Sequence, residues 1–221
     1  MSLLNGPRVL CISLLLVFVA FLAWYDRAAA PLSAEETERY IETITARAQA
    51  AGQTPDPLLL EELRRLAASD DGDEFYMQNL INYRAQAQYP PGSPYSGTGM
   101  EADARYTRGI LPLLFKHGGH PVYLGDVQGR FIDAEGDTQW QRAVLVRYRS
   151  RRDLLEMVVA LASEPVGVHK WASIEKTQVF PTRPVINLMS ARGLVAGLLT
   201  AIGLILHGLL RNRRFYSGLK H

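Results

Sequence analysis

The sequence has very little cysteine, and it has no acidic residue near either end. Its single cysteine, Cys11, excludes a framework of disulfide bonds and any metal cluster held by cysteines. All 22 acidic residues lie between Asp26 and Glu175, so the formal net charge of +2 hides an acidic middle between two basic ends. With 48% hydrophobic residues, the 221-residue chain is long and apolar enough for one folded domain with attachments.

The sequence motifs of several large protein classes are also missing. There is no phosphate-binding loop, no dinucleotide-binding glycine pattern and no nucleophile elbow, which excludes kinase, Rossmann and hydrolase chemistry. The acidic middle excludes nucleic acid as a partner. His117, His120 and His169 are scattered and lack a nearby pattern of carboxylates, so we predict no metal site and no cofactor.

Two long uncharged runs predict two membrane-spanning helices. Residues 9–25 would form a helix of about 25 Å that ends in Trp24 and Tyr25, aromatic residues that favour the membrane interface. Residues 193–210 form the second run, between Arg192 and Arg211. We therefore expect an N-terminal anchor in residues 1–27 and a C-terminal span in residues 193–211.

The first run has an alternative interpretation as a removable signal peptide. Residues 28–30 are three alanines, which resemble a cleavage site, but Pro31 would follow the cut directly. Proline at that position generally blocks the peptidase, which favours a retained anchor.

The charges beside the two runs predict their orientation. Arg8 precedes the first run, and the tail at 212–221 follows Arg211 with further basic residues and no acid. Positive charge marks the cytoplasmic side, so both termini should be cytoplasmic. The middle of the chain should then lie in the periplasm of a bacterium, with the protein crossing its inner membrane twice.

The second run also carries a strip of small side chains. Gly193, Gly197 and Ala201 recur at every fourth position and would lie on one face of the helix. Such a strip allows another helix to approach closely, so we predict helix packing there.

Between the membrane and the main domain, residues 28–70 predict a helical hairpin. Ser33 and Glu36 have the spacing of a capping box at the start of a helix over 34–51. Asp56 and Pro57 are typical of the start of a second helix. The apolar faces of the two helices must be buried, and a stalk with a docking surface is the simplest interpretation.

Residues 71–183 predict an α+β domain of the ferredoxin-like type, joined to the second span by a linker at 184–192. Strands are expected at 74–83, 120–127, 140–149 and 174–180, helices at about 101–117 and 153–163, and a long proline-rich loop at 89–99. The order β-α-β-β-α-β places two helices on one face of a four-stranded antiparallel sheet and leaves the other face open.

Within this domain, three stretches resemble the dimeric α/β-barrel superfamily. They are MQNLINYR at 77–84, Tyr106 in the first helix, and KHGGHPVYLG at 116–125. The resemblance covers about residues 74–180 and implies a homodimer in which two sheets close into a barrel. The superfamily includes cofactor-free monooxygenases and haem-degrading enzymes, and the spans, the stalk and the 89–99 loop depart from its pattern.

Two groups of polar residues are candidate sites. The superfamily's haem-degrading members use Asn, Trp and His, and the residues here that could line a barrel cavity are Asn79, His117, His120, Trp140 and His169, although their spacing does not reproduce that pattern. The second candidate is an anion-binding cluster of Arg142, Arg147, Arg149, Arg151 and Arg152. The alternative for both groups is structural: satisfied backbone groups, packed tryptophans, and a solvated rim of arginines paired with acids.

These features favour a membrane-anchored accessory or scaffolding subunit that binds other membrane proteins. The alternative is a small-molecule or haem-binding enzyme that uses the barrel cavity. Besides the lipid bilayer, the expected partner is a second copy of the chain or another membrane subunit, since an open apolar sheet face needs a cover. The cover could instead be the 28–70 hairpin, which would leave the chain monomeric.

Overall fold

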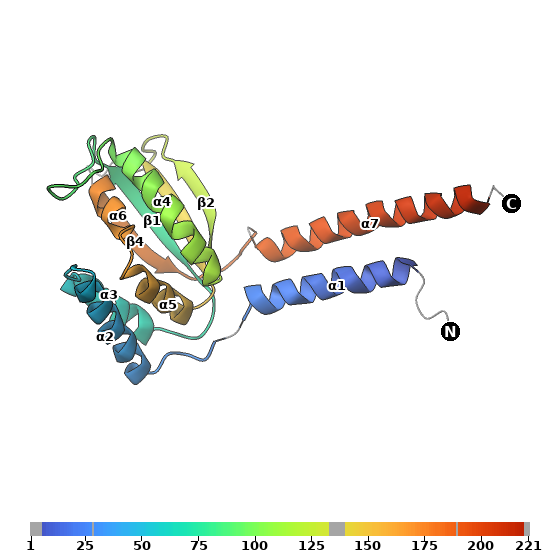
Figure 1. Cartoon of the computed structure of the whole chain (residues 1–221), viewed down its shortest axis with the longest axis horizontal. Helices are drawn as coiled ribbons and strands as arrows, with labels where there is room; N and C mark the ends of the chain where they lie inside the picture. Colours follow the sequence, from blue (N-terminus) through green and yellow to red (C-terminus); the bar gives the residue numbers. More distant parts are fainter. Residues whose placement is uncertain (1–5, 28, 133–139, 189, 219–221) are drawn as a thin grey trace. The chain divides into compact units, whose positions relative to one another are not determined.

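The computed structural model of the chain describes residues 6–27, 29–132, 140–188 and 190–218, with side chains as far as residue 210. The chain divides into two compact units. Unit 1 comprises Met1–Arg27 and Ile186–His221, and unit 2 is Ala28–Val185. Unit 1 contains two apolar helices, and unit 2 is a mixed α+β domain with a four-stranded antiparallel sheet (Figure 1).

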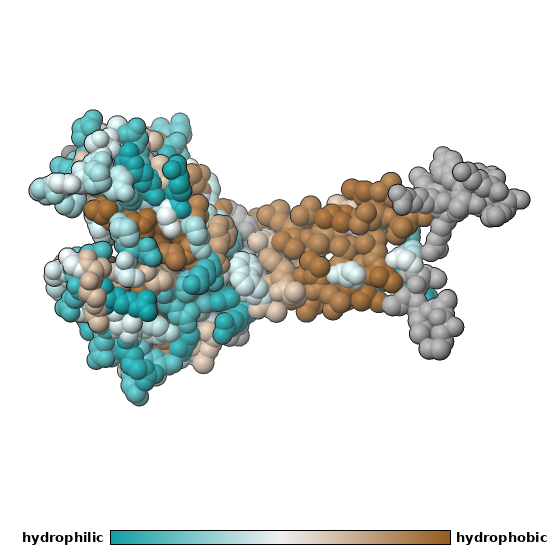
Figure 2. Space-filling view, viewed as in Figure 1, coloured by the Kyte–Doolittle hydropathy of each residue, from teal (hydrophilic) through white to brown (hydrophobic). Residues whose placement is uncertain are grey.

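Unit 1 pairs helix α1 (Gly6–Tyr25) with helix α7 (Ala191–Gly218), and the two run side by side. Both are long and apolar enough to cross a membrane, with the candidate spans at Gly6–Tyr25 and Ala191–Leu210. Their apolar side chains face outward and form the nearly continuous hydrophobic surface in Figure 2. The structure thus confirms two helices of membrane-spanning length where the sequence predicts them.

The end of α1 and the start of α7 are joined by an ion pair. Arg192 Nε lies 3.0 Å and 2.9 Å from the two carboxylate oxygens of Asp26. The same guanidinium lies 5.1 Å from the centre of the Tyr25 ring. The pairing is therefore antiparallel, and farther along it Gly203 lies against Leu14.

Unit 2 begins with the hairpin of helices α2 (Ala34–Ala50) and α3 (Pro57–Ala68). Ser33 and Glu36 form the predicted capping box, and the side chain of Asp56 accepts from the Leu58 backbone at the start of α3. The apolar faces of the hairpin pack together and against helix α5 (Arg151–Leu161), in a cluster of Ile41, Ile44, Leu63, Ala67 and Leu155. The hairpin is thus part of the domain.

The sheet has the order β2-β3-β1-β4, and all neighbours are antiparallel. Its strands are β1 (Phe75–Tyr83), β2 (His120–Asp126), β3 (Arg142–Tyr148) and β4 (Ile174–Thr182). Helix α4 (Gly99–Lys116) and α5 cover one face, in a core of Phe75, Ile110, Leu114, Leu154 and Met157. The hairpin packs outside this helical layer, so it does not cover the opposite face of the sheet.

Two elements differ from the sequence-based prediction, and the structure gives the cause of each difference. Helix α4 starts at Gly99, because Thr98 and Glu101 form a second capping box. The short helix α6 (Gly167–Ser173) was not predicted, since it has only seven residues and no side-chain cap. Its position depends on packing: Val166 lies against Gly109 of α4, and Lys170 Nζ lies 5.6 Å from the Tyr106 ring.

Candidate functional site

The strand register assigns each side chain of the sheet to one of its two faces. Met77 and Val146 are paired and pack into the core beneath the helices. Side chains alternate along a strand, so Tyr76, Leu80 and Leu145 lie on the other face.

The face away from the helices carries exposed apolar side chains. Tyr123, Leu145, Gln78 and Phe180 form a row across all four strands. Tyr123 is 51% exposed and Phe180 is 38% exposed. Tyr123 lies across Gly125, where a side chain would collide with its ring. We call the surface formed by Gln78, Leu80, Tyr123, Leu145 and Phe180 the open face.

The five predicted cavity residues do not come together in one site. Asn79 Nδ2 donates to the backbone carbonyl of Met77, two residues earlier in β1, at 3.1 Å. His117 caps α4, with Nδ1 3.5 Å from a carboxylate oxygen of Glu156. His120 lies on β2, Trp140 precedes β3, and His169 is buried in α6. Among the described residues, no group of three His, Cys, Asp or Glu side chains could hold a metal ion.

The five predicted anion-binding arginines each have a carboxylate partner within the chain. Arg147 is only 1% exposed, and its Nε lies 2.6 Å from Glu74. The other pairs are Arg142 with Asp126, Arg149 with Asp153, Arg151 with Asp71 and Arg152 with Glu36. Arg152 lowers the pKa of Glu36 to about 2, chiefly through their hydrogen bond. Anion binding by these arginines stays a prediction. Their ion pairs with carboxylates of the same chain do not favour it.

The predicted small-residue strip on α7 makes no close contact with the described part of α1. A side chain added at Gly193 or Gly197 would meet no atom within 4 Å, and Ala201 is exposed. The glycine that contacts α1 is Gly203, which the sequence did not single out. Helix packing through the strip therefore stays a prediction, and it would involve a helix other than α1.

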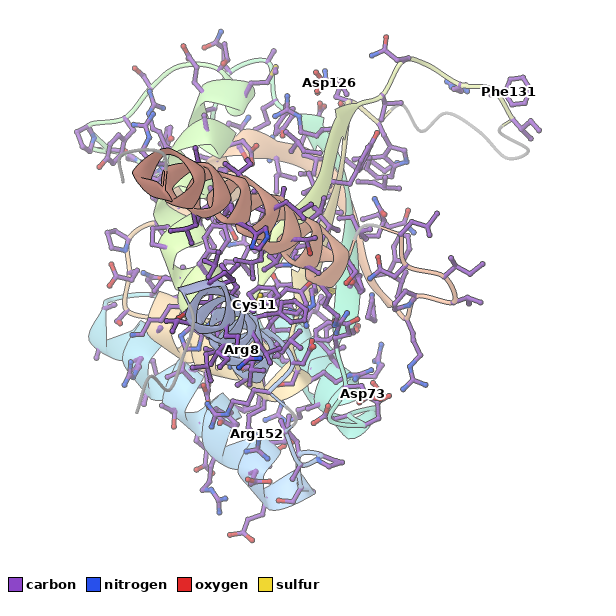
Figure 3. All side chains as sticks on the ribbon, turned by 90° about the vertical axis from the view of Figure 1, so that its right-hand side faces the viewer. Arg8, Cys11, Asp73, Asp126, Phe131 and Arg152 are labelled. Carbon is purple, nitrogen blue, oxygen red and sulfur yellow. The ribbon has the colours of Figure 1, made fainter. Side chains whose placement is uncertain are left out.

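A cleft of about 1130 Å³ lies at the end of β1. Its walls come from the last residues of β1, the start of α4, the residues just before β3, and the segment 127–132 that follows β2. In Figure 3, Phe131 lies on this segment well beyond Asp126, the last residue of β2. Of the predicted cavity residues, only Trp140 lines this cleft.

Arg84 lines the same cleft directly after β1, and its backbone is held on both sides. Its N–H donates to Ser173 O at 2.9 Å, and its carbonyl accepts from Gly99 N at 3.1 Å. A side chain at Gly99 would lie 2.5 Å from Arg84 O and 2.6 Å from Ser173 O, so only glycine fits at this junction. The Arg84 Nε is buried and has no hydrogen-bond partner among the described residues.

A second polar cluster lies beside this junction and fixes the proline-rich loop. The Tyr89 hydroxyl is 2.9 Å from His169 Nδ1, and Arg105 Nη1 donates to the same hydroxyl at 3.3 Å. The Tyr95 ring packs edge-on against His169. Burial, with a smaller effect of the positive charge on Arg105, lowers the pKa of His169. The sequence flagged His169 and the loop separately, and nothing in it indicated that they meet.

No known protein family model matches this chain, and no curated protein matches it. Two crystal structures of an RPA0582 protein are similar to it. The methylated form matches with a TM-score of 0.53 and 26% sequence identity, over 61% of this chain and 95% of that one. The second, described as a protein of unknown function from Rhodopseudomonas palustris, matches with a TM-score of 0.52 and 26% identity, over 60% of this chain and 96% of that one. Almost the whole of that protein has a counterpart here, while more than a third of this chain lies outside the match.

Proposed function

We propose that this chain is a membrane-anchored accessory subunit whose unit 2 lies in the periplasm and helps to assemble other membrane proteins. The observation that carries the proposal is a partly exposed, partly apolar sheet face on a domain attached to two helices of membrane-spanning length. Apolar faces of this kind usually mark contact surfaces. The two helices add a second contact surface within the bilayer.

The domain itself is proposed to be ferredoxin-like and of the dimeric α/β-barrel type. The sequence of elements and the strand order β2-β3-β1-β4 support this assignment. The open face would then be covered by the same face of a second copy, in an arrangement with twofold symmetry. The hairpin packs on α5 and is not available as a cover.

The dimer is tested by measuring the mass of the detergent-solubilised chain. We expect a dimer for the natural chain and a monomer for Phe180→Glu, which places a charge on the open face. Leu58→Glu is the matched control, because Leu58 is exposed on α3, away from the sheet. A natural chain that stays monomeric at micromolar concentration would overturn the dimer.

The orientation in the membrane follows from charge and pairing. The antiparallel contact of α1 and α7 supports placing the far ends of both helices on one side, and the basic tail supports the cytoplasm as that side. Alkaline phosphatase fused after residue 185 should therefore be active. An inactive fusion would contradict the periplasmic placement.

The assembly role is tested by purification in a mild detergent. We expect another membrane protein to co-purify in a fixed ratio, and Gly197→Leu to release it by filling the small-residue strip. Leu198→Phe adds comparable bulk at the next, exposed position and should retain the partner. A chain that purifies alone from its native membrane would count against the role.

A further inference from the structure

Arg84 differs from the other arginines of unit 2 that are shielded from water. Among the described residues, each of the others donates to a carboxylate, a hydroxyl or a carbonyl: Arg64, Arg105, Arg142, Arg147, Arg149, Arg151 and Arg152. Arg84 is half-buried, and within that described part its guanidinium has no such partner. A partly desolvated cation without a counter-charge costs free energy, and a bound anion would offset that cost.

The guanidinium stands on a rigid support. Both backbone groups of Arg84 are bonded, to Ser173 at the end of α6 and to Gly99 at the start of α4. Gln141 holds the adjoining strand end, because its Oε1 accepts from Tyr83 N at 2.7 Å. A cation anchored in this way is pre-organised, and little conformational entropy is lost when it binds a ligand.

The surroundings of Arg84 narrow the class of ligand. The cleft is lined by the Arg84 side chain, whose positive charge favours an anionic ligand. Trp140 and Met100 supply apolar wall, and Asn82 supplies an amide. The first turn of α4 lies at the same wall, and the positive end of a helix dipole also favours an anion.

We propose that the cleft at the end of β1 binds a small organic carboxylate with an aromatic or apolar body, held by the Arg84 guanidinium. A guanidinium and a carboxylate match in a two-bond geometry, and such charged hydrogen bonds are stronger than neutral ones. The body of the ligand would rest against Trp140. The site needs only residues of one chain and does not depend on the proposed membrane role.

Calorimetric titration of the full chain in detergent tests this site with benzoate as the probe. We expect benzoate to bind and benzamide, its uncharged analogue, not to bind. Arg84→Gln should weaken benzoate binding by at least about tenfold, the loss typical of one charged hydrogen bond. Arg108→Gln removes an exposed guanidinium from α4 and should leave binding unchanged.

Three results would overturn the proposal. The first is no benzoate binding up to about 10 mM of added ligand, a rough limit for a single charged contact. The second is equal benzoate binding by Arg84→Gln and by the natural chain. The third is tighter binding of inorganic phosphate than of benzoate. A thermal unfolding scan without ligand separates binding from folding. Arg84→Gln should unfold at the same temperature as the natural chain or higher, because it removes an uncompensated charge.

Discussion

The helix pair of unit 1 and the domain of unit 2 use charge and apolar surface in opposite ways. In the domain, apolar side chains are buried between layers, and ion pairs join segments distant in sequence, such as Glu36 with Arg152. In the helix pair, apolar side chains face outward, and the Asp26–Arg192 pair joins the helices at one end. In lipid, burying apolar surface contributes little free energy to helix association. Close packing contacts and the polar pair therefore contribute a larger share of the association free energy.

The largest effect is expected where the domain buries a charge. Glu74→Gln would leave Arg147, which is 1% exposed, without its carboxylate. Breaking a buried pair on one side costs about 3–5 kcal/mol. Denaturant unfolding of the full chain, followed by the circular dichroism of the domain, would measure the loss. Glu35→Gln is the control: it breaks an exposed pair with Arg39 and should cost less than about 1 kcal/mol. Equal losses of stability in the two variants would contradict the difference expected between a buried and an exposed ion pair.

The second effect tests whether the hairpin is part of the domain. Leu155 on α5 is buried against the hairpin, so Leu155→Ala should cost about 2–5 kcal/mol in the free energy of unfolding. The Leu155→Ala substitution should also make α2 and α3 more rapidly cleaved by a protease. Leu59→Ala on the exposed side of α3 is the control. If Leu155→Ala leaves proteolysis unchanged, the hairpin is held by other contacts.

A smaller effect is expected in the helix pair, because Asp26 and Arg192 are both partly exposed. Cys11 and His207 line the same groove between α1 and α7, so His207→Cys provides a crosslinking partner for the single natural cysteine. Oxidation should form a bond within one chain, and Asp26→Asn should slow it about two- to fivefold, as expected for a pair worth up to ~1 kcal/mol. Exchanging the charges, Asp26→Arg with Arg192→Asp, should restore the rate. Crosslinks formed only between chains would contradict the pairing.

The smallest effect concerns acid and the proline-rich loop. Burial holds the pKa of His169 below its usual value of 6.5, so the fold favours the neutral ring facing Tyr89, Tyr95 and Arg105. This contribution to stability is present above about pH 6.5 and is lost as the pH falls through the lowered pKa. The protection factor of the Gln88 amide, whose N–H donates to Ala172 O, should therefore fall below pH 6.5 when hydrogen exchange is corrected for its slower intrinsic rate in acid. His169→Gln should remove that dependence, and an unchanged profile in this variant would assign it to another group.

The sequence predicted the elements whose signals are local. The Ser33–Glu36 box and the Asp56–Pro57 start act within four residues, and the strands alternate over a few residues, so their positions agree with the structure. Helix α6 has no such signal because tertiary packing stabilises it. The sequence also did not indicate that the Arg84 side chain lacks a partner among the described residues, although Arg84 ends the stretch at 77–84 that resembles the dimeric α/β-barrel superfamily. This lack becomes visible only when the other arginines are matched with partners as many as 122 residues away.

The position of β4 has a consequence for the order of folding. The central strand β1 pairs with β4, and Tyr76 is paired with Thr182. This edge of β1 can therefore form its hydrogen bonds only after residue 182 has been synthesised. Synthesis from the N-terminus therefore delivers α1, the hairpin and three strands while the edge of β1 is still unpaired. The strand that completes the sheet ends only nine positions before α7 begins at Ala191. Pairings this distant in sequence form slowly, so the nascent domain exposes an unpaired strand edge until almost the whole chain has been made.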